Sequence, residues 1–403
     1  MKTSAKILLL AALAAISLIS CGKSNSKIDE TDRKVMILYS AGFNSLSSYL
    51  RTNINELKQG WLPTKSKGQN IVLVVSKPLN GTYSNQTAPV LIRMYKNGST
   101  TVMDTVKTYA VGRKLADAES FKSIMQDIKS MYPAKSYGMV FSSHATGWLP
   151  DGYYSNPGYY ESSSNVKKRT IGQEVYVENG INRSAEMEVE EMAAALPYKL
   201  DYLLIDACLA GCVEVAYAFR GKVDIMGFSQ AEVLSEGFDY TTMTELILKN
   251  NTPEKVCEAY IEHYKARSGD WRSATISVVR PSDMNDLASV CKDLAEKYRT
   301  QINALDYTGV QEFGGTKHWF FDLKDIFIKA GATADELKTL ESALSKCVYY
   351  KDHTGQYYSA TDASTHPITV FSGLSMYLPS VEGNYLHNFY KSLSWNKAVQ
   401  LVK

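Results

Sequence analysis

Apolar runs of strand length alternate with helical patterns over the first 230 residues of the chain. Most of these runs are continuously apolar, as in strands that are buried on both faces of a sheet. The alternation predicts an α/β fold with a mostly parallel sheet. Strands are predicted at 34–40, 70–76, 88–98, 200–206 and 222–230, with a further strand that ends in a loop at 136–148, and helices at 44–59, 117–131, 184–196 (Ser184 as N-cap) and 208–219.

The pattern changes in two places. Residues 151–170 are rich in Gly, Ser, Asn and Tyr and end in basic residues, which indicates a long exposed loop. After about residue 300 the alternation becomes irregular, although 336–348 has a helical pattern and 368–379 resembles a strand. We therefore expect a core at 33–300 and a C-terminal subdomain at 301–403 that completes the same unit.

The N-terminus has the pattern of a bacterial export signal over residues 1–20. An apolar stretch at 7–19, preceded by lysines, is too short to span a bilayer. It ends in "LISC", which resembles the lipobox of bacterial lipoproteins, in which lipid is attached to the cysteine, here Cys21. Such an anchor would hold the protein at the membrane, in the periplasm or on the outer surface, with 21–32 as a polar tether. The alternative is an ordinary secretory peptide with an incidental cysteine.

Composition and charge exclude little beyond a nucleic-acid partner. Charged residues make up 21% of the 403 residues and hydrophobic ones 45%, as in ordinary globular proteins. A formal net charge of +2 produces no field that would mark nucleic-acid binding. The 27 tyrosines fit buried strand positions better than a secreted binding surface.

Five cysteines follow Cys21, an odd number that leaves at least one thiol unpaired outside the cytoplasm. No two of them have the spacing of zinc ligands. Cys208 and Cys212, at i and i+4, are poorly placed for a disulfide on a helix.

Two strand ends carry the residues best suited to chemistry. One strand leads into His144, in "SSHATGW", and the other into Asp206 and Cys208, in "IDACLAG". Ligands bind at the carboxyl ends of strands in open α/β sheets, so these side chains should lie at one edge. We expect Cys208 to begin the following helix, where unpaired N–H groups and the dipole favour the thiolate. Thiolate and imidazole are the groups that cysteine peptidases use for acyl transfer.

Simpler interpretations exist for the same residues. A cysteine between an apolar strand and a helix is usually a small core residue, which we expect of Cys212. A histidine after a strand is often a hydrogen-bonded polar residue without a catalytic role. A metal site using His144 and Cys208 lacks further ligands at suitable spacing.

Both motifs are similar to those of the clostripain family of bacterial cysteine peptidases, in the caspase-like clan. "VMILYSAGFNSL" resembles the family's opening strand and loop, "SSHATGW" its histidine motif and "IDACLAGCVEVAYAF" its cysteine motif. "GFSQAEVLSEGFDY", "WFFDLKDIF", "SGLSMYLP" and the segment around Trp395 also look familial. The resemblance covers about residues 33–400. It implies a caspase-like αβα sandwich with a central mostly parallel sheet and C-terminal additions.

The resemblance implies Cys208 as nucleophile and His144 as the catalytic imidazole. It places the oxyanion hole at the backbone N–H groups of Cys208 and Ala145. The family usually has glycine where this chain has Ala145, which would be costly if the backbone there required a positive φ. The opening loop "AGFNSL" also lacks the acidic residue common in the family.

Clostripain-like peptidases prefer Arg or Lys before the scissile bond and bind it with acidic residues in the S1 pocket. Asp206 matches one such position, and Glu236 lies close to where a second is expected. A carboxylate that faces a guanidinium rejects neutral side chains because its own charge is left unpaired. The alternatives are an N-cap of the next helix for Asp206 and an exposed loop carboxylate for Glu236.

The family is often made as a zymogen that is cleaved after a basic residue between the two motifs. Lys167, Lys168 and Arg169, in "NVKKRT", are candidates for self-cleavage, or only a solvated basic turn. No cofactor is expected. Some family members need calcium, but no acidic segment here has the pattern of a calcium-binding loop.

These observations predict a lipid-anchored cysteine endopeptidase of clostripain type that cleaves proteins or peptides after Arg or Lys. The alternative is a non-catalytic surface lipoprotein that binds a ligand on an inherited peptidase fold. Ala145 and the tyrosine-rich loop at 151–170 are the features that favour this alternative.

Overall fold

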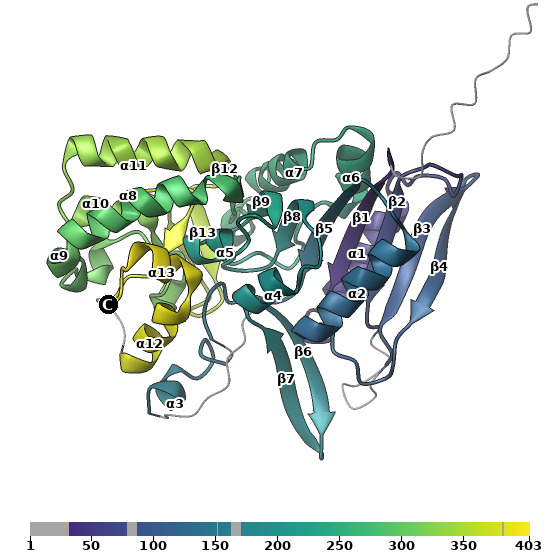
Figure 1. Cartoon of the computed structure of the whole chain (residues 1–403), viewed down its shortest axis with the longest axis horizontal. Coiled ribbons are helices and arrows are strands. Elements are labelled where there is room, and N and C mark those ends of the chain that lie inside the picture. The colour runs from purple at the N-terminus through teal and green to yellow at the C-terminus, as the bar shows by residue number, and fades with distance from the viewer. Residues whose placement is uncertain (1–31, 79–86, 151, 163–170, 381–382) are drawn as a thin grey trace, which may run out of the picture.

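The computed structural model describes residues 32–78, 87–150, 152–162, 171–380 and 383–403 (Figure 1). Within this part of the chain, a nine-stranded sheet runs through the molecule. Its order is β12 (Val348–His353), β10 (Thr275–Val279), β9 (Val223–Phe228), β8 (Leu200–Asp206), β5 (Ser136–Ser142), β1 (Lys34–Ser40), β2 (Ile71–Ser76), β3 (Val90–Asn97) and β4 (Thr100–Thr108). The strands from β9 to β2 are parallel, and antiparallel strands flank them on both sides. The predicted α/β fold with a mostly parallel sheet is confirmed.

Alternate side chains of the central strands enter two separate cores. On β1, Val35, Ile37 and Tyr39 belong to one core, whereas Met36 and Leu38 belong to the other. Both sets are buried, which is why the apolar runs are continuous rather than alternating.

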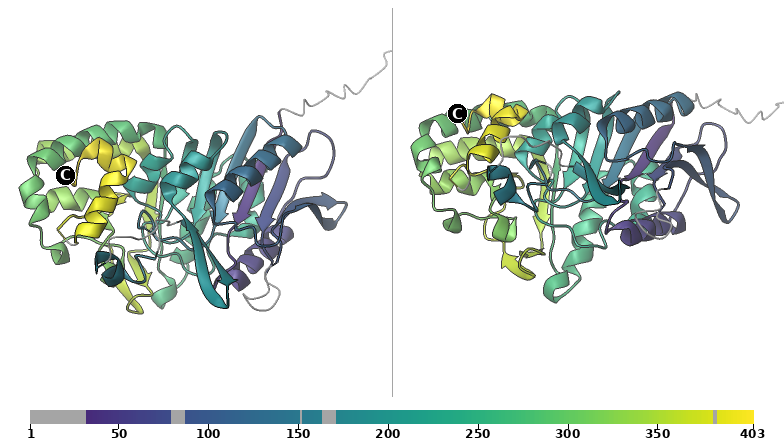
Figure 2. Two further views of the ribbon diagram at one scale, coloured as in Figure 1. Left: turned by 60° about the horizontal axis from the view of Figure 1, so that its bottom comes forward. Right: turned by 90° about the horizontal axis from the view of Figure 1, so that it is seen from below.

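Helices cover both faces of the sheet, so the fold is an αβα sandwich (Figure 2). One face carries α1 (Ser47–Gln59), α6 (Tyr240–Thr244) and α7 (Glu254–Lys265). The other core receives side chains from α2 (Ala118–Met131), α4 (Val189–Ala195), α5 (Val213–Ala218), α8 (Met284–Lys297), α9 (Arg299–Asn303), α10 (Leu323–Lys329), α11 (Ala334–Cys347), α12 (Asn384–Ser392) and α13 (Ser394–Val399). In Figure 2, the purple α1 and the blue α2 lie on opposite sides of the strands.

The C-terminal part of the chain joins the same sheet. β12 pairs with β10 in antiparallel fashion, next to the parallel strands. Two small two-stranded sheets add to this part, namely β11 (Phe321–Asp322) with β15 (Ser375–Met376) and β13 (Gln356–Ser359) with β14 (Ser364–Pro367). Only the two residues of β15 form a strand within the strand-like segment 368–379. Among the described residues, no helix is both long and apolar enough to cross a membrane.

The predicted helix at 184–196 is wrong in its first part. Residues 171–187 form a hairpin of β6 (Ile171–Glu178) and β7 (Ile181–Met187), so Ser184 lies in a strand and caps no helix. α4 begins only at Val189, and the hairpin projects from the body of the molecule (Figure 1). Asn179 and Gly180, both with positive φ (52° and 76°), form the two-residue turn that favours such a hairpin. α3 (Pro157–Ser162) is a short helix within the expected loop.

Candidate active site

The ends of β5 and β8 bring the two predicted catalytic residues to one edge of the sheet. The strands are parallel and in register, with Ser142 opposite Asp206. His144 and Cys208 each follow two residues beyond this pair. The backbone N–H of Ser143 donates to the carbonyl of Asp206 (3.4 Å), which continues the pairing past the strand ends. The register of two strands therefore sets the relative position of His144 and Cys208.

Cys208 does not begin a helix, contrary to the prediction from the sequence. α5 begins at Val213 with Cys212 as its N-cap residue, and Cys208 lies in the turn before it. The turn pairs instead with the segment after β9, because the Leu209 N–H donates to the carbonyl of Ala231 (3.0 Å). Leu209 has a φ of +58°, a conformation that side-chain-bearing residues rarely adopt and that is found preferentially at functional turns.

The surroundings of Cys208 favour the neutral thiol, again contrary to expectation. Burial raises the pKa of Cys208 to about 12, and the carboxylates of Glu232 and Asp206 act in the same direction. Two contacts oppose them, one from the backbone N–H of Val233 to Sγ (3.4 Å) and one from the backbone N–H of Cys208 itself. The helix dipole that was expected to stabilise a thiolate does not act at Cys208, because α5 starts five residues later than expected.

The imidazole of His144 is held by a serine that the sequence did not single out. The hydroxyl of Ser45 lies 2.8 Å from Nε2 of His144. Burial lowers the pKa of His144, which favours the neutral ring. Among the described residues, no hydrogen bond joins the side chains of His144 and Cys208. The resting site is thus a neutral thiol and a neutral imidazole.

The loop that carries Ser45 is fixed from several sides. Asn44 accepts a hydrogen bond from the Leu46 N–H (2.8 Å) and donates from Nδ2 to the carbonyl of Gln173 (2.6 Å). The N–H of Gly172 in turn donates to the carbonyl of His144 (3.1 Å). The start of β6 therefore ties the Ser45 loop to the His144 loop.

Two backbone N–H groups stand where an oxyanion hole was expected. Neither the N–H of Ala145 nor that of Cys208 donates a backbone hydrogen bond to another described residue. Ala145 is absent from the residues with positive φ in the described chain, so alanine costs nothing there. The departure from glycine at this position is therefore no reason to favour the non-catalytic alternative.

Asp206 is a buried carboxylate beneath the loop that follows β9. Its Oδ2 accepts from the hydroxyl of Tyr240 (2.6 Å) and more weakly from Ser142 (3.3 Å). Burial raises its pKa to about 6, although these hydrogen bonds favour the charged form. The alternative of a helix N-cap is wrong, because Cys212 occupies that position on α5. Gly237 passes directly over Asp206, where a Cβ would come within 2.5 Å of Oδ2, so only glycine fits.

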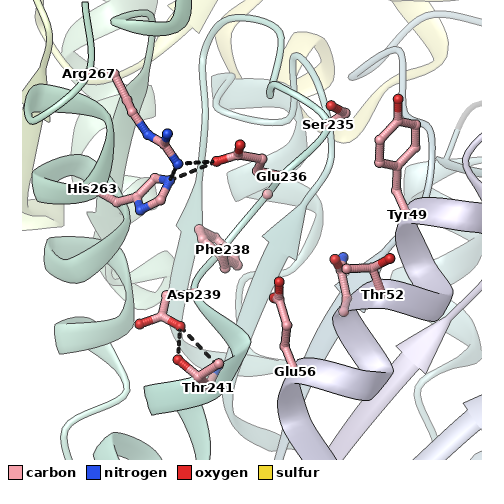
Figure 3. Close-up of a pocket in the computed structure, with 12 residues that line it drawn as sticks. Tyr49, Thr52, Glu56, Ser235, Glu236, Phe238, Asp239, Thr241, His263 and Arg267 are labelled. Atoms are coloured by element: carbon pink, nitrogen blue, oxygen red, sulfur yellow. Dashed lines mark hydrogen bonds and ion pairs between the residues drawn. The ribbon is translucent and has the colours of Figure 1, made fainter. Parts of the chain in front are cut away.

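A cavity of about 490 Å³ opens above Gly237, between α1 and α7 (Figure 3). Glu236 forms one wall of it, where its Oε2 contacts Arg267 Nη2 (2.8 Å) and His263 Nε2 (2.9 Å). Glu56 points from α1 into the space between the two helices, and burial raises its pKa. The lining also includes Tyr49, Thr52, Asn53, Ser235, Phe238, Asp239 and Thr241.

The remaining candidates from the sequence divide into two groups. Cys21, Lys167, Lys168 and Arg169 lie outside the described residues. The five cysteines from Cys208 onward are all free thiols, and Cys212 is fully buried as expected. Within the described chain, no three His, Cys, Asp or Glu residues are grouped so that they could hold a metal ion.

A model of the clostripain family matches residues 38–400. This chain belongs to the clostripain family of cysteine peptidases. It is similar to the inactive zymogen of a C11 protease from Parabacteroides distasonis, with a TM-score of 0.75 and 28% identity over 92% of this chain and 98% of that one. A secreted C11 cysteine protease from Bacteroides thetaiotaomicron, in complex with an irreversible peptide inhibitor, has the same fold (TM-score 0.75, 24% identity, 91% and 99% covered). These structures confirm the caspase-like sandwich. No curated protein matches the chain significantly.

Proposed function

We propose that this clostripain-family protein is an endopeptidase that cleaves after Lys or Arg, with Cys208 as nucleophile and His144 as acid and base. The register of β5 and β8 carries this proposal, because it sets both residues at one sheet edge beside two N–H groups that have no backbone partner among the described residues. A substrate peptide would bind at this edge with the oxygen of its scissile carbonyl directed at the N–H groups of Ala145 and Cys208.

The neutral resting pair defines the sequence of proton transfers. The Cys208 thiol gives its proton to the imidazole of His144 as the sulfur attacks the carbonyl carbon. The resulting oxyanion is stabilised by the two backbone N–H groups. The imidazolium then protonates the leaving amine as the C–N bond breaks, and water, deprotonated by His144, releases the acyl group and restores the thiol.

The acidic cavity is the candidate S1 pocket. Two chain segments both border it and touch the catalytic pair. The loop at 231–236 contacts Sγ of Cys208 through Val233 and ends in Glu236, and the segment 45–56 contacts His144 through Ser45 and ends in Glu56. A side chain that extends from an acyl carbon on Cys208 between these segments would meet carboxylates. This supports selection of basic residues at P1.

Covalent labelling tests the assignment of nucleophile and pocket together. A peptidyl acyloxymethyl ketone with Lys at P1 should add one inhibitor residue to the protein, located on Cys208 by peptide mapping. The matched norleucine compound should react far more slowly, and Cys208→Ala should not react. Labelling of another cysteine, or equal rates for Lys and norleucine, would contradict the proposal.

We infer that the protein is also processed in the loop before β6. The basic residues Lys167, Lys168 and Arg169 are suitable substrates for an enzyme with this specificity, and β6 begins at Ile171. Mass spectrometry of the purified protein should find a new N-terminus directly after one of them. The Cys208→Ala variant should remain intact; a cleaved Cys208→Ala variant would show that another protease acts.

We further propose that Cys21 is lipidated and holds the protein at the cell envelope. The support is the lipobox-like end of an export signal. Full-length protein should partition into the detergent phase of Triton X-114 and Cys21→Ser into the aqueous phase. Equal partitioning of both would contradict the anchor.

A further inference from the structure

Arg267 contacts a carboxylate that the proposed S1 pocket needs for its substrate. It follows the end of α7, and its Nη2 lies 2.8 Å from Oε2 of Glu236. His263 reaches the same oxygen from one turn earlier (2.9 Å). Figure 3 shows both side chains converging on Glu236 from the same side of the cavity. The protein thus places a guanidinium of its own where a P1 guanidinium would bind.

Both contacts use one oxygen of Glu236. Among the described residues, no hydrogen bond reaches Oε1 of Glu236, and none reaches the carboxylate of Glu56. Asp239 is unavailable, because as N-cap of α6 it binds the Thr241 N–H (2.9 Å) and the Thr242 hydroxyl (2.7 Å). Within the lining of the cavity, a P1 side chain therefore finds Glu56 and a single oxygen of Glu236, while the carboxylate of Asp206 lies directly beneath Gly237 at its floor.

Arg and Lys at P1 of the substrate differ in what they require of a carboxylate in the pocket. A guanidinium binds best through two parallel N–H bonds to both oxygens, whereas an ammonium is a compact charge that needs no such pair. Arg267 and His263 together fill the acceptor sites of Oε2, which removes the two-bond geometry at Glu236. Arg267 also repels either substrate cation, but its pair with Glu236 is about 40% exposed on each side (42% and 41%), so this repulsion is screened.

We propose that Arg267 is a specificity-determining residue of the S1 pocket, which shifts the preference at P1 from Arg toward Lys by occupying, together with His263, one oxygen of Glu236. This inference rests on the proposed function. The residue acts through Glu236 alone, so its effect should depend on the presence of that carboxylate.

The test compares kcat/KM for two fluorogenic peptides that differ only in Lys or Arg at P1. The enzymes are loop-cleaved wild type, Arg267→Met, Glu236→Gln and the double variant. Arg267→Met should raise kcat/KM about tenfold for the Arg peptide and about threefold for the Lys peptide. In the Glu236→Gln background, the same substitution should leave the Lys/Arg ratio unchanged.

Two further variants serve as controls. Lys255→Met removes a positive charge from the exposed start of α7, away from the cavity, and should leave the ratio as in wild type. Arg267→Lys keeps a charge that contacts one oxygen and should keep most of the wild-type ratio. Thermal unfolding midpoints within a few degrees of wild type would show that each variant is folded.

The possible failures are distinguishable. An unchanged Lys/Arg ratio in folded Arg267→Met, or a shift that persists without Glu236, would overturn this inference while leaving the proposed function intact. Wild-type protein that cleaves neither peptide would overturn the proposed function and this inference with it.

Discussion

At the scale of single residues, the structure gives His144 a side-chain partner, Ser45. In triads of this kind, a third group fixes the orientation and tautomer of the imidazole. Ser45 is in position to do so, since its hydroxyl lies 2.8 Å from Nε2. It is a positioning residue, and it stands in the loop that lacks the acidic residue common in the family.

Ser45→Ala should lower kcat about tenfold with little change in KM, because the imidazole loses its orientation while the substrate contacts remain. Steady-state kinetics on a Lys peptide measures both constants. Ser45→Thr, which retains the hydroxyl, should recover most of the activity. Ser48→Ala, on the exposed side of α1, is the matched control, and a Ser45→Ala enzyme as active as that control would rule out the role.

The pH dependence of P1 selection should follow Asp206. Its pKa of about 6 means that the carboxylate is charged above this pH and protonated below it. The ratio of kcat/KM for a Lys peptide to that for a norleucine peptide should therefore fall as pH drops from 7.5 to 5. The ratio cancels the titration of the catalytic pair, which acts on both peptides. A flat ratio, or the same fall in Asp206→Asn, would mean that Asp206 does not contribute.

At the scale of elements, the start of β6 connects the processing loop to the site. The Val175 N–H donates to the carbonyl of Phe43 (2.8 Å), and Gly172 binds the His144 loop. Lys77 and Glu174 form an ion pair whose side chains are each only 1% exposed, and Glu174 also accepts from the Leu115 N–H (2.6 Å). The β6 residues in these contacts lie on the C-terminal side of the candidate cleavage points and their partners lie on the N-terminal side, so the contacts join the two prospective fragments.

Cleavage after Lys167, Lys168 or Arg169 should therefore leave the two fragments associated. We expect two bands on a denaturing gel but a single species with the summed mass in native mass spectrometry. Separation would expose the apolar surface that the two fragments bury together, because they share one sheet and both cores. The Lys77–Glu174 ion pair is buried between them. Glu174→Ala protein, which lacks this pair, should lose its fragments at lower urea concentration. Spontaneous separation of the wild-type fragments in buffer would contradict this prediction.

The elements also show what the sequence could and could not reveal. Continuous apolar runs located the central strands well, because a strand that is buried on both faces of a sheet needs apolar residues at every position. The helix expected at Cys208 failed because "CLAG" is apolar in either conformation, and only pairing with Ala231 and its neighbours selects the turn. Ser45 and Arg267 carried no signal, since their partners are 99 and 31 residues away in sequence.

At the scale of the whole molecule, the C-terminal part is tied to the site through a buried carboxylate. Glu214 on α5 is 2% exposed and accepts from the Tyr390 hydroxyl (2.7 Å) and the Tyr377 N–H (3.1 Å). Burial raises its pKa to about 7. These contacts join α12 and the segment after β15 to the helix that follows the cysteine turn.

Tyr390→Phe should lower the free energy of unfolding by about 1–2 kcal/mol, because it removes a hydrogen bond from a buried carboxylate. Urea unfolding followed by tyrosine and tryptophan fluorescence measures the change. Tyr159→Phe alters a tyrosine that is 63% exposed and should leave the stability unchanged. A Tyr390→Phe protein as stable as Tyr159→Phe would show that the contact contributes nothing.

Cys208 and His144 are the proposed catalytic pair of a peptidase selective for basic P1 residues. The most direct test of this proposal is turnover of Lys, Arg and norleucine fluorogenic peptides by loop-cleaved protein, with and without calcium, after the Cys208→Ala and His144→Ala variants have been cut in the same loop by an added protease. Wild type should cleave the Lys and Arg peptides and not the norleucine one, and Cys208→Ala and His144→Ala should each lose at least about a thousandfold in kcat. Turnover that survives in Cys208→Ala, or wild-type protein inactive on both basic peptides under both conditions, would contradict the claim.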